Sequence, residues 1–378
     1  MRKKKKILII CFTSPVRDLR FKREIDFLKD EFDVTVAGAA PAYPGLSFEE
    51  IKCRPQTWLN HFSFKLGLLF GSFTPLIRRY SVSRDFLKKT DFDLVICNDL
   101  LPLPLAFKIA KGAPVFWDAH EYYPEELASG SLGQKCSNRS AYRLCKKLLP
   151  DVNAMSSVCP AICARYRNEF SLSEEPLLIR NIPYYQDLIP SQTFPDKIRM
   201  IHHGGINQDR KIEVMIDFMD LLDSRFTLDL MLMHNESNRE YYDFIVKKAS
   251  HNPKIRVLQP VSQSCLVKKT NEYDLGLFLM PPTNYNTEKA LPNKIFEYIQ
   301  ARLAVAIGPS PEMAAIVKQY DVGVVSEDFS PESLAAALKK LSFEDIVRFK
   351  QNSDLAAHEL CAEKEMPKLV EKIKELLA

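Results

Sequence analysis

Short runs of apolar residues alternate along the chain with longer segments in which apolar residues recur every three or four positions. The runs predict buried strands, and the longer segments predict helices that cover them, as in parallel sheets. The predicted strands are Ile7–Cys11, Val34–Ala37, Leu94–Cys97, Val115–Trp117, Ala154–Val158, Met200–His203, Leu228–Leu232, Ile255–Leu258, Leu275–Leu279, Ala304–Ile307 and Gly323–Val325. The predicted helices include Phe21–Lys29, Leu103–Ala110, Ala161–Phe170 and Glu213–Leu222.

The alternation is interrupted once, at residues 183–197, which hold three prolines and few aliphatic residues and are predicted to be a linker. We therefore expect an α/β protein with two Rossmann-like, doubly wound domains that face a central cleft, at residues 1–182 and 198–362. Residues 363–378 are predicted to form an amphipathic helix that packs back on the N-terminal domain. A length of 378 residues also favours two domains. Ligands of such sheets bind beyond the carboxyl ends of the strands.

Composition places the chain among ordinary globular proteins, because 46% of the residues are hydrophobic and 26% are charged. The nine cysteines are scattered, without zinc-ligand spacing, and are predicted to be reduced thiols in a cytoplasmic protein. At the N-terminus a basic run precedes only Ile7–Phe12, which predicts a first strand and not a signal peptide. No apolar run approaches the roughly 20 residues of a membrane span.

Positive charge is concentrated in the first half of the chain. The net charge is +4, but residues 1–190 hold 28 Lys+Arg and 21 Asp+Glu, a balance of +7, and the remainder is acidic. Residues 58–80 mix large apolar side chains with Lys65, Arg78 and Arg79. This composition suggests weak binding to an anionic membrane surface or a helix that faces a lipid-linked acceptor, and a core helix with a basic outer face is the alternative. Nucleic acid is not expected, since no nucleic-acid-binding module is recognised.

A candidate anion site lies where a helix begins after Leu291. Pro292 suits a helix entry, Asn293 is predicted to cap the helix, and Lys294 adds a positive charge to its first turn. Free N–H groups and the helix dipole favour an anion there, and a diphosphate is the natural candidate. Glu297 lies one turn further and can accept hydrogen bonds from sugar hydroxyls. An ordinary capped helix with a solvated lysine is the alternative.

A second candidate follows the strand Met200–His203. Gly204 and Gly205 allow a ligand to approach the backbone closely, and the basic pair Arg210 and Lys211 comes next. A solvated basic pair in a turn is the alternative to a role in binding.

A third group of polar residues follows strands of the first half. In the segment VFWDAHEYYP a buried strand ends in Asp118 and His120, and Asn98 and Asp99 lie at the end of the preceding strand. Polar residues at carboxyl ends of sheet strands face the ligand side. A buried Asp–His contact that only holds the loop is the alternative for Asp118 and His120, and capping of the next helix is the alternative for Asn98 and Asp99.

These segments resemble retaining GT-B glycosyltransferases of family 4. LPNKIFEY, the strand LAVAIG, PEMAAIV and DVGVV are similar to the donor-binding segment of that family, in an LPNK-type subgroup. VFWDAHEYYP is similar to its DAHE segment, and Asp18–Glu24 to its DxRxxRE pattern. The resemblance covers nearly the whole chain in the right order.

The resemblance implies roles for the residues of the second half. Glu297 would bind the nucleotide ribose, and Arg210, or failing it Lys211, would neutralise the departing diphosphate. The family's other glutamate, which touches the donor sugar, corresponds to Lys289 here. A family arginine after the first glycine corresponds to Gly205.

The resemblance also assigns roles elsewhere. His120 would approach the transferred sugar, oriented by Asp118. Arg20 and Arg23 would face the acceptor or the donor phosphates, although Arg23 and its neighbour Glu24 could equally be surface charges of a helix. Glu312, after another strand end, would touch the donor.

The implied function is sugar transfer with retention and without a metal or other cofactor. The donor would be a nucleotide-diphosphate sugar and the acceptor a saccharide or lipid-linked saccharide, in bacterial surface polysaccharide or glycoconjugate assembly. A peripheral location on the inner face of the plasma membrane would fit. A GT-B sugar 2-epimerase and a non-catalytic subunit that binds nucleotide sugars are the alternatives. A dehydrogenase is not expected, because no GxGxxG follows the first strand.

Overall fold

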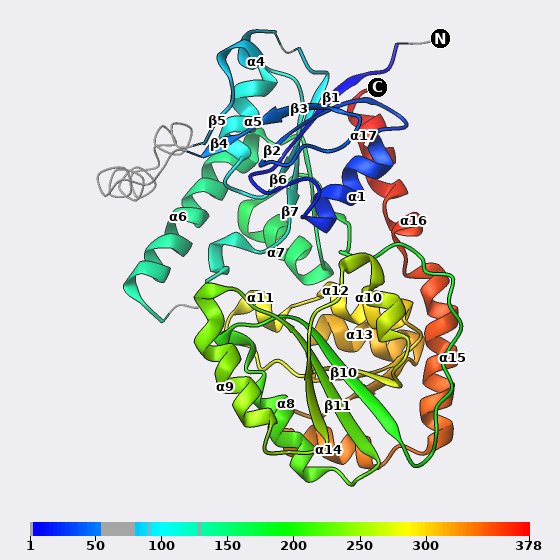
Figure 1. Ribbon diagram of the computed structural model, residues 1–378. Helices are drawn as coiled ribbons and strands as arrows, with labels where there is room; N and C mark the ends of the chain where they lie inside the picture. The colour runs from blue at the N-terminus through cyan, green and yellow to red at the C-terminus, as the bar shows by residue number, and fades with distance from the viewer. Residues whose placement is uncertain (1–2, 54–79, 90, 128–129) are drawn as a thin grey trace. The chain divides into compact units, whose positions relative to one another are not determined.

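The computed structural model describes residues 3–53, 80–89, 91–127 and 130–378, and the chain forms two compact units (Figure 1). Unit 1 runs to Arg180 and also takes in Asn284–Asn286 and Glu365–Ala378. Unit 2 comprises Asn181–Thr283 and Thr287–Lys364. Element labels follow Figure 1.

Unit 1 is built on a parallel sheet with the strand order β3-β2-β1-β6-β7-β8-β9. Its central strands are buried throughout, because helices cover both faces of a parallel sheet. The strands are β1 (Lys6–Ile10), β2 (Asp33–Gly38), β3 (Ser47–Glu50), β6 (Leu94–Asn98), β7 (Val115–Ala119), β8 (Ala154–Ser157) and β9 (Leu177–Leu178).

The helices of unit 1 alternate with these strands, and the last helix of the chain lies beside α1 (Figure 1). A two-residue antiparallel pair, β4 (Lys52–Cys53) and β5 (Tyr80–Ser81), stands apart from the main sheet. The helices are α1 (Leu19–Leu28), α4 (Arg84–Lys89), α5 (Leu103–Ala110), α6 (Leu132–Leu148), α7 (Pro160–Phe170) and α17 (Pro367–Leu376).

Unit 2 has a parallel sheet of order β12-β11-β10-β13-β14-β15, which is the Rossmann order 3-2-1-4-5-6 in sequence terms. Its strands are β10 (Ile198–Gly205), β11 (Phe226–Met233), β12 (Ile255–Leu258), β13 (Leu275–Phe278), β14 (Ala304–Ile307) and β15 (Gly323–Val325). Its helices are α8 (Glu213–Asp217), α9 (Arg239–Ala249), α10 (Gln263–Thr270), α12 (Asn293–Gln300), α13 (Pro311–Tyr320), α14 (Pro331–Lys339) and α15 (Phe343–Glu359). The short helices α11 (Tyr285–Glu288) and α16 (Ala362–Glu365) lie where the chain passes from one unit to the other.

The predicted fold class and every predicted strand are confirmed, with ends shifted by a few residues. The predicted helix Glu213–Leu222 is correct only in its first half. α8 ends at Asp217, and a 3-10 turn, Phe218–Leu221, follows. Lys254 Nζ donates to the carbonyl oxygens of Met219 and Leu222, so these groups need no helical partner.

The segment 183–197 has no helix or strand and hydrogen-bonds with unit 2. Gln186 N donates to Gln300 Oε1 over 2.9 Å, and Lys350 Nζ donates to Ser191 O over 2.8 Å. The basic, aromatic stretch 58–80 lies outside the described residues except for Tyr80. The nine cysteines, all within the described residues, form no disulfide, and six of them are buried and three exposed. Within the described ranges, no helix has the length and apolar character needed to cross a bilayer.

Candidate functional site

Two groups of polar side chains lie at carboxyl ends of strands, one in each unit. In unit 1, β6 pairs with β7 so that Asn98 stands opposite Asp118. His120 follows β7 and reaches both positions. Its Nε2 lies 3.0 Å from Asp118 Oδ2 and 3.1 Å from Asn98 Oδ1, and its Nδ1 lies 3.1 Å from Asp99 Oδ1. The sheet therefore assembles the polar residues that the sequence predicted after these two strands.

Arg20, a residue of α1, contacts the same aspartate as this histidine. Its guanidinium binds both carboxylate oxygens of Asp118 and donates to Ile179 O over 2.8 Å, and it is only 5% exposed. Arg23 and Glu24 are also buried, at 5% and 1% exposed. The alternative that Arg23 and Glu24 are surface charges is therefore wrong. Arg20 forms a buried ion pair with Asp118, so its guanidinium is not accessible to an acceptor.

Asn98 and Asp99 do not cap the following helix. α5 has Pro102 as its N-cap residue and no side-chain cap. Asn98 instead donates from Nδ2 to Glu24 Oε2 over 2.7 Å, and Asp99 accepts from the Tyr123 hydroxyl. Sequence reasoning missed the contributions of Glu24 and Tyr123, since no local pattern marks a partner that lies far along the chain.

The charges of this cluster shift the pKa values of its members. Burial alone would lower the pKa of His120, but Asp99 and Asp118 outweigh it and raise the pKa to about 9. Burial alone would raise the pKa of Asp118, but Arg20 and His120 hold it well below its usual range. His120 is therefore an imidazolium at neutral pH and Asp118 a carboxylate. Both ring nitrogens of His120 face the carboxylates of Asp99 and Asp118, so a sugar hydroxyl can accept from the imidazolium only in place of one of them.

We expect the raised pKa of His120 to make stability depend on pH. Because the folded pKa, about 9, exceeds the unfolded value, His120 stabilises the fold fully below about pH 6.5. That contribution, about 3 kcal/mol, is lost as the pH rises from there through about pH 9. Urea titrations between pH 6 and 10 should show this loss in the wild type, and His120→Gln should flatten it. Equal slopes for both proteins would contradict the assignment.

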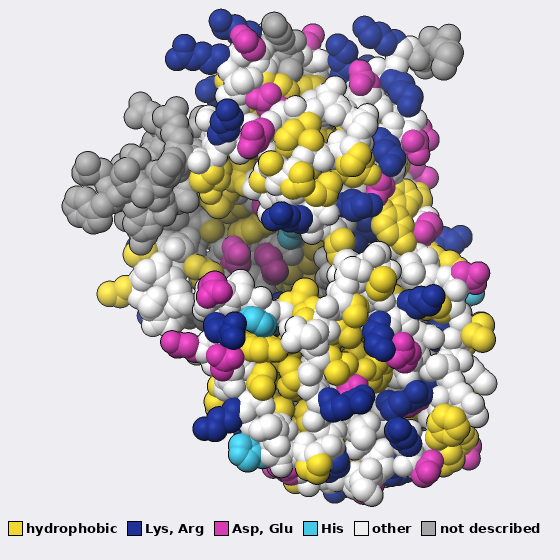
Figure 2. Space-filling model, viewed as in Figure 1, with side chains coloured by type: hydrophobic (Ala, Val, Ile, Leu, Met, Phe, Trp, Pro, Cys, Tyr) yellow, Lys and Arg dark blue, Asp and Glu magenta, His cyan; other side chains and the backbone are white. Residues whose placement is uncertain are grey.

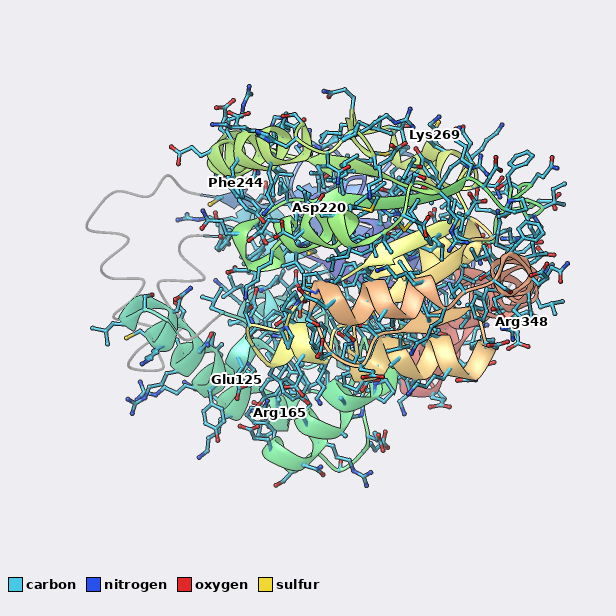
Figure 3. The ribbon with its side chains drawn as sticks, turned by 90° about the horizontal axis from the view of Figure 1, so that it is seen from below. Glu125, Arg165, Asp220, Phe244, Lys269 and Arg348 are labelled. Carbon is cyan, nitrogen blue, oxygen red and sulfur yellow. The ribbon has the colours of Figure 1, made fainter. Side chains whose placement is uncertain are left out.

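A neighbouring segment of unit 1 is held by Asn286. Its side chain accepts from Tyr122 N over 2.7 Å and donates to Tyr122 O over 3.0 Å. The Arg165 guanidinium lies 4.1 Å from the ring centres of both Tyr122 and Tyr285, and it pairs with Glu125 (Figure 3). Asn286 thus fixes the loop after His120 to the tripeptide that unit 1 takes from the second half of the chain.

In unit 2, the end of β10 and the start of α12 lie side by side. Gly204 has a φ of +126°, which disfavours any residue with a Cβ, and a Cβ there would lie 2.5 Å from Lys294 Cε. Arg210 Nη1 donates to Gly205 O over 2.7 Å. The glycine turn, Arg210 and Lys294 therefore surround one point. A diphosphate site formed by both segments requires the glycine turn and the start of α12 to be this close.

This point is electropositive. Burial and the charge of Arg210 lower the pKa of Lys294 to about 8. Burial and Lys294 also lower the pKa of His202, to about 3, so this neighbour is neutral. Glu297 is 5% exposed, accepts from Gln263 Nε2 over 3.0 Å and lies 3.8 Å from His203 Nδ1. Two neighbouring cations, one of which lowers the pKa of the other, favour the binding of an anion with more than one charge.

The start of α12 differs from the prediction in one respect. Pro292, with an extended backbone, is the N-cap residue, and Asn293 is the first helical residue. Asn293 Oδ1 accepts from Asn181 Nδ2 over 3.0 Å, so the expected asparagine cap is wrong. No side chain caps the helix, which leaves its first N–H groups for a ligand.

The remaining candidates of the second half lie on other segments of unit 2. Lys211 is exposed in a left-handed conformation, with φ of +46°, at the end of the turn that carries Arg210. Lys289 pairs with Glu288 over 2.7 Å. Glu312 lies in the first turn of α13, after β14. Gln263, at the start of α10, is an additional contact of Glu297 that no sequence signal indicated.

We expect diphosphate binding to take up a proton near pH 8. A bound anion raises the pKa of Lys294, so affinity should fall as the pH rises through about 8 and change little below pH 7. Calorimetry of a nucleoside diphosphate in two buffers with different ionisation enthalpies measures the uptake, which should be about half a proton at pH 8 and approach one proton at about pH 9. Lys294→Met should abolish it. Unchanged uptake in this variant would show that another group titrates.

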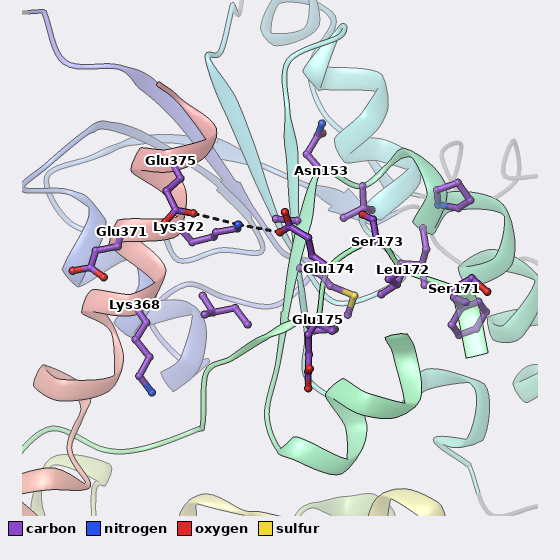
Figure 4. A pocket seen from close by; sticks show the side chains of 18 residues that line it. Asn153, Ser171, Leu172, Ser173, Glu174, Glu175, Lys368, Glu371, Lys372 and Glu375 are labelled. Atoms are coloured by element: carbon purple, nitrogen blue, oxygen red, sulfur yellow. Dashed lines mark hydrogen bonds and ion pairs between the residues drawn. The ribbon is translucent and has the colours of Figure 1, made fainter. Parts of the chain in front are cut away.

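A third feature is a cavity of about 620 Å³ in unit 1 (Figure 4). It lies at the amino end of β8, between the segment Ser171–Leu177 and α17. Lys372 bridges Glu174 and Glu375 across it, at 3.1 and 3.2 Å. It lies at the amino ends of the strands, whereas ligands of a doubly wound sheet bind at the carboxyl ends. On the face in Figure 2, basic and acidic side chains are intermixed over the described surface.

The comparisons with known proteins relate the chain to solved structures through its fold. No family model and no curated protein matches the sequence. Sucrose-phosphate synthase from Thermosynechococcus elongatus aligns with a TM-score of 0.77 and 11% identity, over 98% of this chain and 100% of that chain. Anabaena HepE in complex with UDP-glucose aligns with a TM-score of 0.71 and 12% identity, over 98% and 100%.

A third similar structure is WaaG, a glycosyltransferase involved in lipopolysaccharide biosynthesis. It aligns with a TM-score of 0.64 and 12% identity, over 95% of this chain and 98% of that chain. At such identities the likeness shows the fold alone. This chain therefore has the two Rossmann-like α/β domains of GT-B glycosyltransferases.

Proposed function

We propose that the chain is a glycosyltransferase that moves a sugar from a nucleotide-diphosphate-sugar donor to a saccharide or lipid-linked saccharide acceptor. The observation that carries the proposal is the cluster of Arg210, Lys294 and Gly204 at the uncapped start of α12. Two cations and free N–H groups at one point match a diphosphate. Solved structures of the same fold that contain UDP or UDP-glucose support the choice of a nucleotide sugar.

The proposed chemistry follows from where charge develops. When the bond between sugar and phosphate breaks, negative charge grows on the diphosphate. Arg210 and Lys294 stabilise that charge more than they stabilise the ground state, and this difference accelerates the reaction. Glu297 would hold the ribose, because its carboxylate lies one turn along α12 from Lys294 and can accept from two hydroxyls. Glu312 and Lys289 are proposed to contact the donor sugar.

In unit 1 we propose that the Nδ1–H of His120 donates a hydrogen bond to the transferred sugar in place of Asp99, and that Asp118 holds the ring through Nε2. Retention of configuration, independence of metal ions and a cytoplasmic, peripheral location on the plasma membrane are further parts of the proposal. Retention and metal independence rest on the resemblance of the LPNK and DAHE segments to family 4 enzymes, and the peripheral location rests on the composition of residues 58–80. A role in bacterial surface polysaccharide or glycoconjugate assembly would fit the same resemblance.

Incubation with a panel of nucleotide sugars, with and without lipid-linked and free saccharide acceptors, tests the proposal. We expect release of the nucleoside diphosphate that depends on an acceptor. A changed sugar without an acceptor would indicate a 2-epimerase. Binding without release would indicate a non-catalytic subunit, which the presence of Lys289 and Gly205 in place of the family residues would explain.

We expect Glu297→Ala to weaken donor binding more than it slows turnover. A hydrogen bond to a charged acceptor is worth about 1.5–3 kcal/mol, so loss of even one of them should raise KM for the donor at least tenfold. Steady-state kinetics with the active nucleotide sugar measure the change. A matched change at the exposed Glu332 of α14, Glu332→Ala, should leave KM as in the wild type. An unaltered KM in Glu297→Ala would remove the ribose from this position.

A further inference from the structure

A second cavity of unit 1, of about 680 Å³, adjoins the His120 cluster. Its walls come from Phe12 and Thr13 after β1, the turn Asp99–Pro102 after β6, the 3-10 turn that begins at Tyr123, and α6. This volume falls within the roughly 300–1,000 Å³ of small-molecule sites. The cavity also opens at the carboxyl ends of strands, where ligands of doubly wound sheets bind.

Most of the lining is apolar, and large apolar side chains continue to its rim. Phe12 stacks on Tyr80 with the ring centres 3.9 Å apart, and Leu144 forms part of the floor. Leu101 is 39% exposed and Leu132 is 82% exposed. A continuous apolar lining with exposed leucines at its edge is typical of a surface that receives another apolar group.

One end of the cavity is polar and leads to His120. Asp99 lines it, accepts from the Tyr123 hydroxyl, and lies 3.1 Å from His120 Nδ1. Glu126 lines the same end, where burial and the charge of Asp99 raise the pKa of its carboxyl. A molecule in the cavity could therefore place a hydroxyl group near the histidine while its apolar part remains against the hydrophobic walls.

The helix that forms one wall carries only positive charge. α6 holds five basic residues and no acidic one: Lys135, Arg139, Arg143, Lys146 and Lys147. Cys136, Ser140 and Leu144 line the cavity at a spacing of four residues. Lys135, Arg139 and Arg143 each stand one position before a lining residue, about 100° around the helix, so a basic stripe runs along α6 next to the face that lines the cavity. This charge complements an anionic group on the occupant.

We propose that this cavity binds the hydrocarbon part of an anionic amphiphile, that the stripe of Lys135, Arg139 and Arg143 binds its phosphate-type group, and that this amphiphile is the acceptor. The inference rests on the proposed function and narrows its acceptor to the lipid-linked class. An amphiphile dispersed in water and one presented by a membrane have the same chemistry, so the experiment treats them separately.

The exposed thiol of Cys136 in the cavity wall reports occupancy. The full-length chain with Cys53→Ser and Cys265→Ser keeps Cys136 as its exposed cysteine among the described residues. We expect dodecyl phosphate, below its micelle concentration, to slow maleimide labelling about tenfold at ten times its Kd. Inorganic phosphate at the same concentration should not protect. Protection by inorganic phosphate, or none by dodecyl phosphate, would overturn the inference.

Two kinds of variant distinguish the contribution of the apolar cavity to binding from that of the basic stripe on α6. Ser137→Trp and Ala141→Trp place an indole in the cavity and should raise the Kd of dodecyl phosphate at least tenfold. Ser137 is exposed, so this variant should remain folded. Lys135→Ala with Arg139→Ala should weaken binding severalfold at low salt and less at high salt. The control Lys108→Ala with Lys318→Ala removes two exposed lysines elsewhere and should bind as the wild type does.

Two further readouts complete the test. Vesicles of phosphatidylglycerol should protect Cys136 only if a lipid chain from them enters the cavity. If the protein sediments with the vesicles but monomeric dodecyl phosphate does not protect Cys136, then a surface of the protein and not the cavity binds the lipid, and the inference is overturned. Nucleotide-sugar binding is measured in parallel, and Ser137→Trp should leave it unchanged. Turnover of the nucleotide sugar without protection of Cys136 by dodecyl phosphate would refute this inference and leave the proposed function in place. Protection without any donor binding would refute the proposed function.

Discussion

Arg210→Ala should reduce kcat at least 100-fold while the protein remains folded. Arg210 reaches the glycine turn and Lys294 from a 3-10 turn, and its Nη1 already donates to Gly205 O. Removal of one group that stabilises developing charge in a transition state typically costs about 100- to 1,000-fold in rate. KM for the donor should change less than kcat, because much of the negative charge appears only when the bond breaks.

The comparison with Lys211→Ala makes this expectation sharper. Sequence reasoning left either residue as the neutralising cation, and the structure distinguishes them. Lys211 is exposed at a left-handed position, whereas Arg210 lies close to Lys294 and lowers its pKa. We expect Lys211→Ala to retain roughly wild-type kcat, since a solvated surface charge contributes little. Steady-state rates for both variants, with circular dichroism as the check on folding, decide the matter. Loss of activity in Lys211→Ala alone would reverse the assignment.

The strands of this protein could be predicted because they are buried on both faces. A run such as Ile7–Cys11 contains no polar interruption, so its type and position follow from composition alone. The edge strands β3 (Ser47–Glu50) and β9 (Leu177–Leu178) could not be predicted in this way. They are short and only partly buried, and β3 ends in two glutamates. Their pairing depends on the neighbouring strand and not on a pattern of their own.

In the candidate site, too, residues that belong to a local pattern could be predicted, and contacts between distant residues could not. Gly204, Arg210 and Lys294 could be proposed from sequence because each lies in a local pattern at a strand end or a helix start. What surrounds them depends on contacts between distant residues. Arg20 and Asp118 are 98 positions apart, and neither local pattern showed that they form a buried pair. Asn293 satisfied the composition of a cap, but the extended backbone of Pro292 takes that position instead.

Asp118→Ala should destabilise unit 1 by about 3–5 kcal/mol, because it leaves the buried guanidinium of Arg20 without its carboxylate. Ser156 Oγ, which donates to Asp118 over 2.5 Å, would also lose its acceptor. Calorimetry of the unit 1 transition measures the loss. Asp151→Ala, at an exposed aspartate of the same unit, is the matched control and should change stability by less than about 0.5 kcal/mol.

The pH dependence of this loss separates the role of Asp118 in the fold from its contact with His120. At pH 10 the imidazolium has lost its proton, whereas Arg20 stays charged at any accessible pH. The destabilisation should therefore persist at pH 10 if the pair with Arg20 is its main cause. Arg20→Met combined with Asp118→Leu removes both charges and should recover much of the stability, as replacement of a buried pair by apolar residues often does. A loss that vanishes by pH 10, or a double variant no more stable than Asp118→Ala, would mean that Asp118 serves chiefly to hold the histidine.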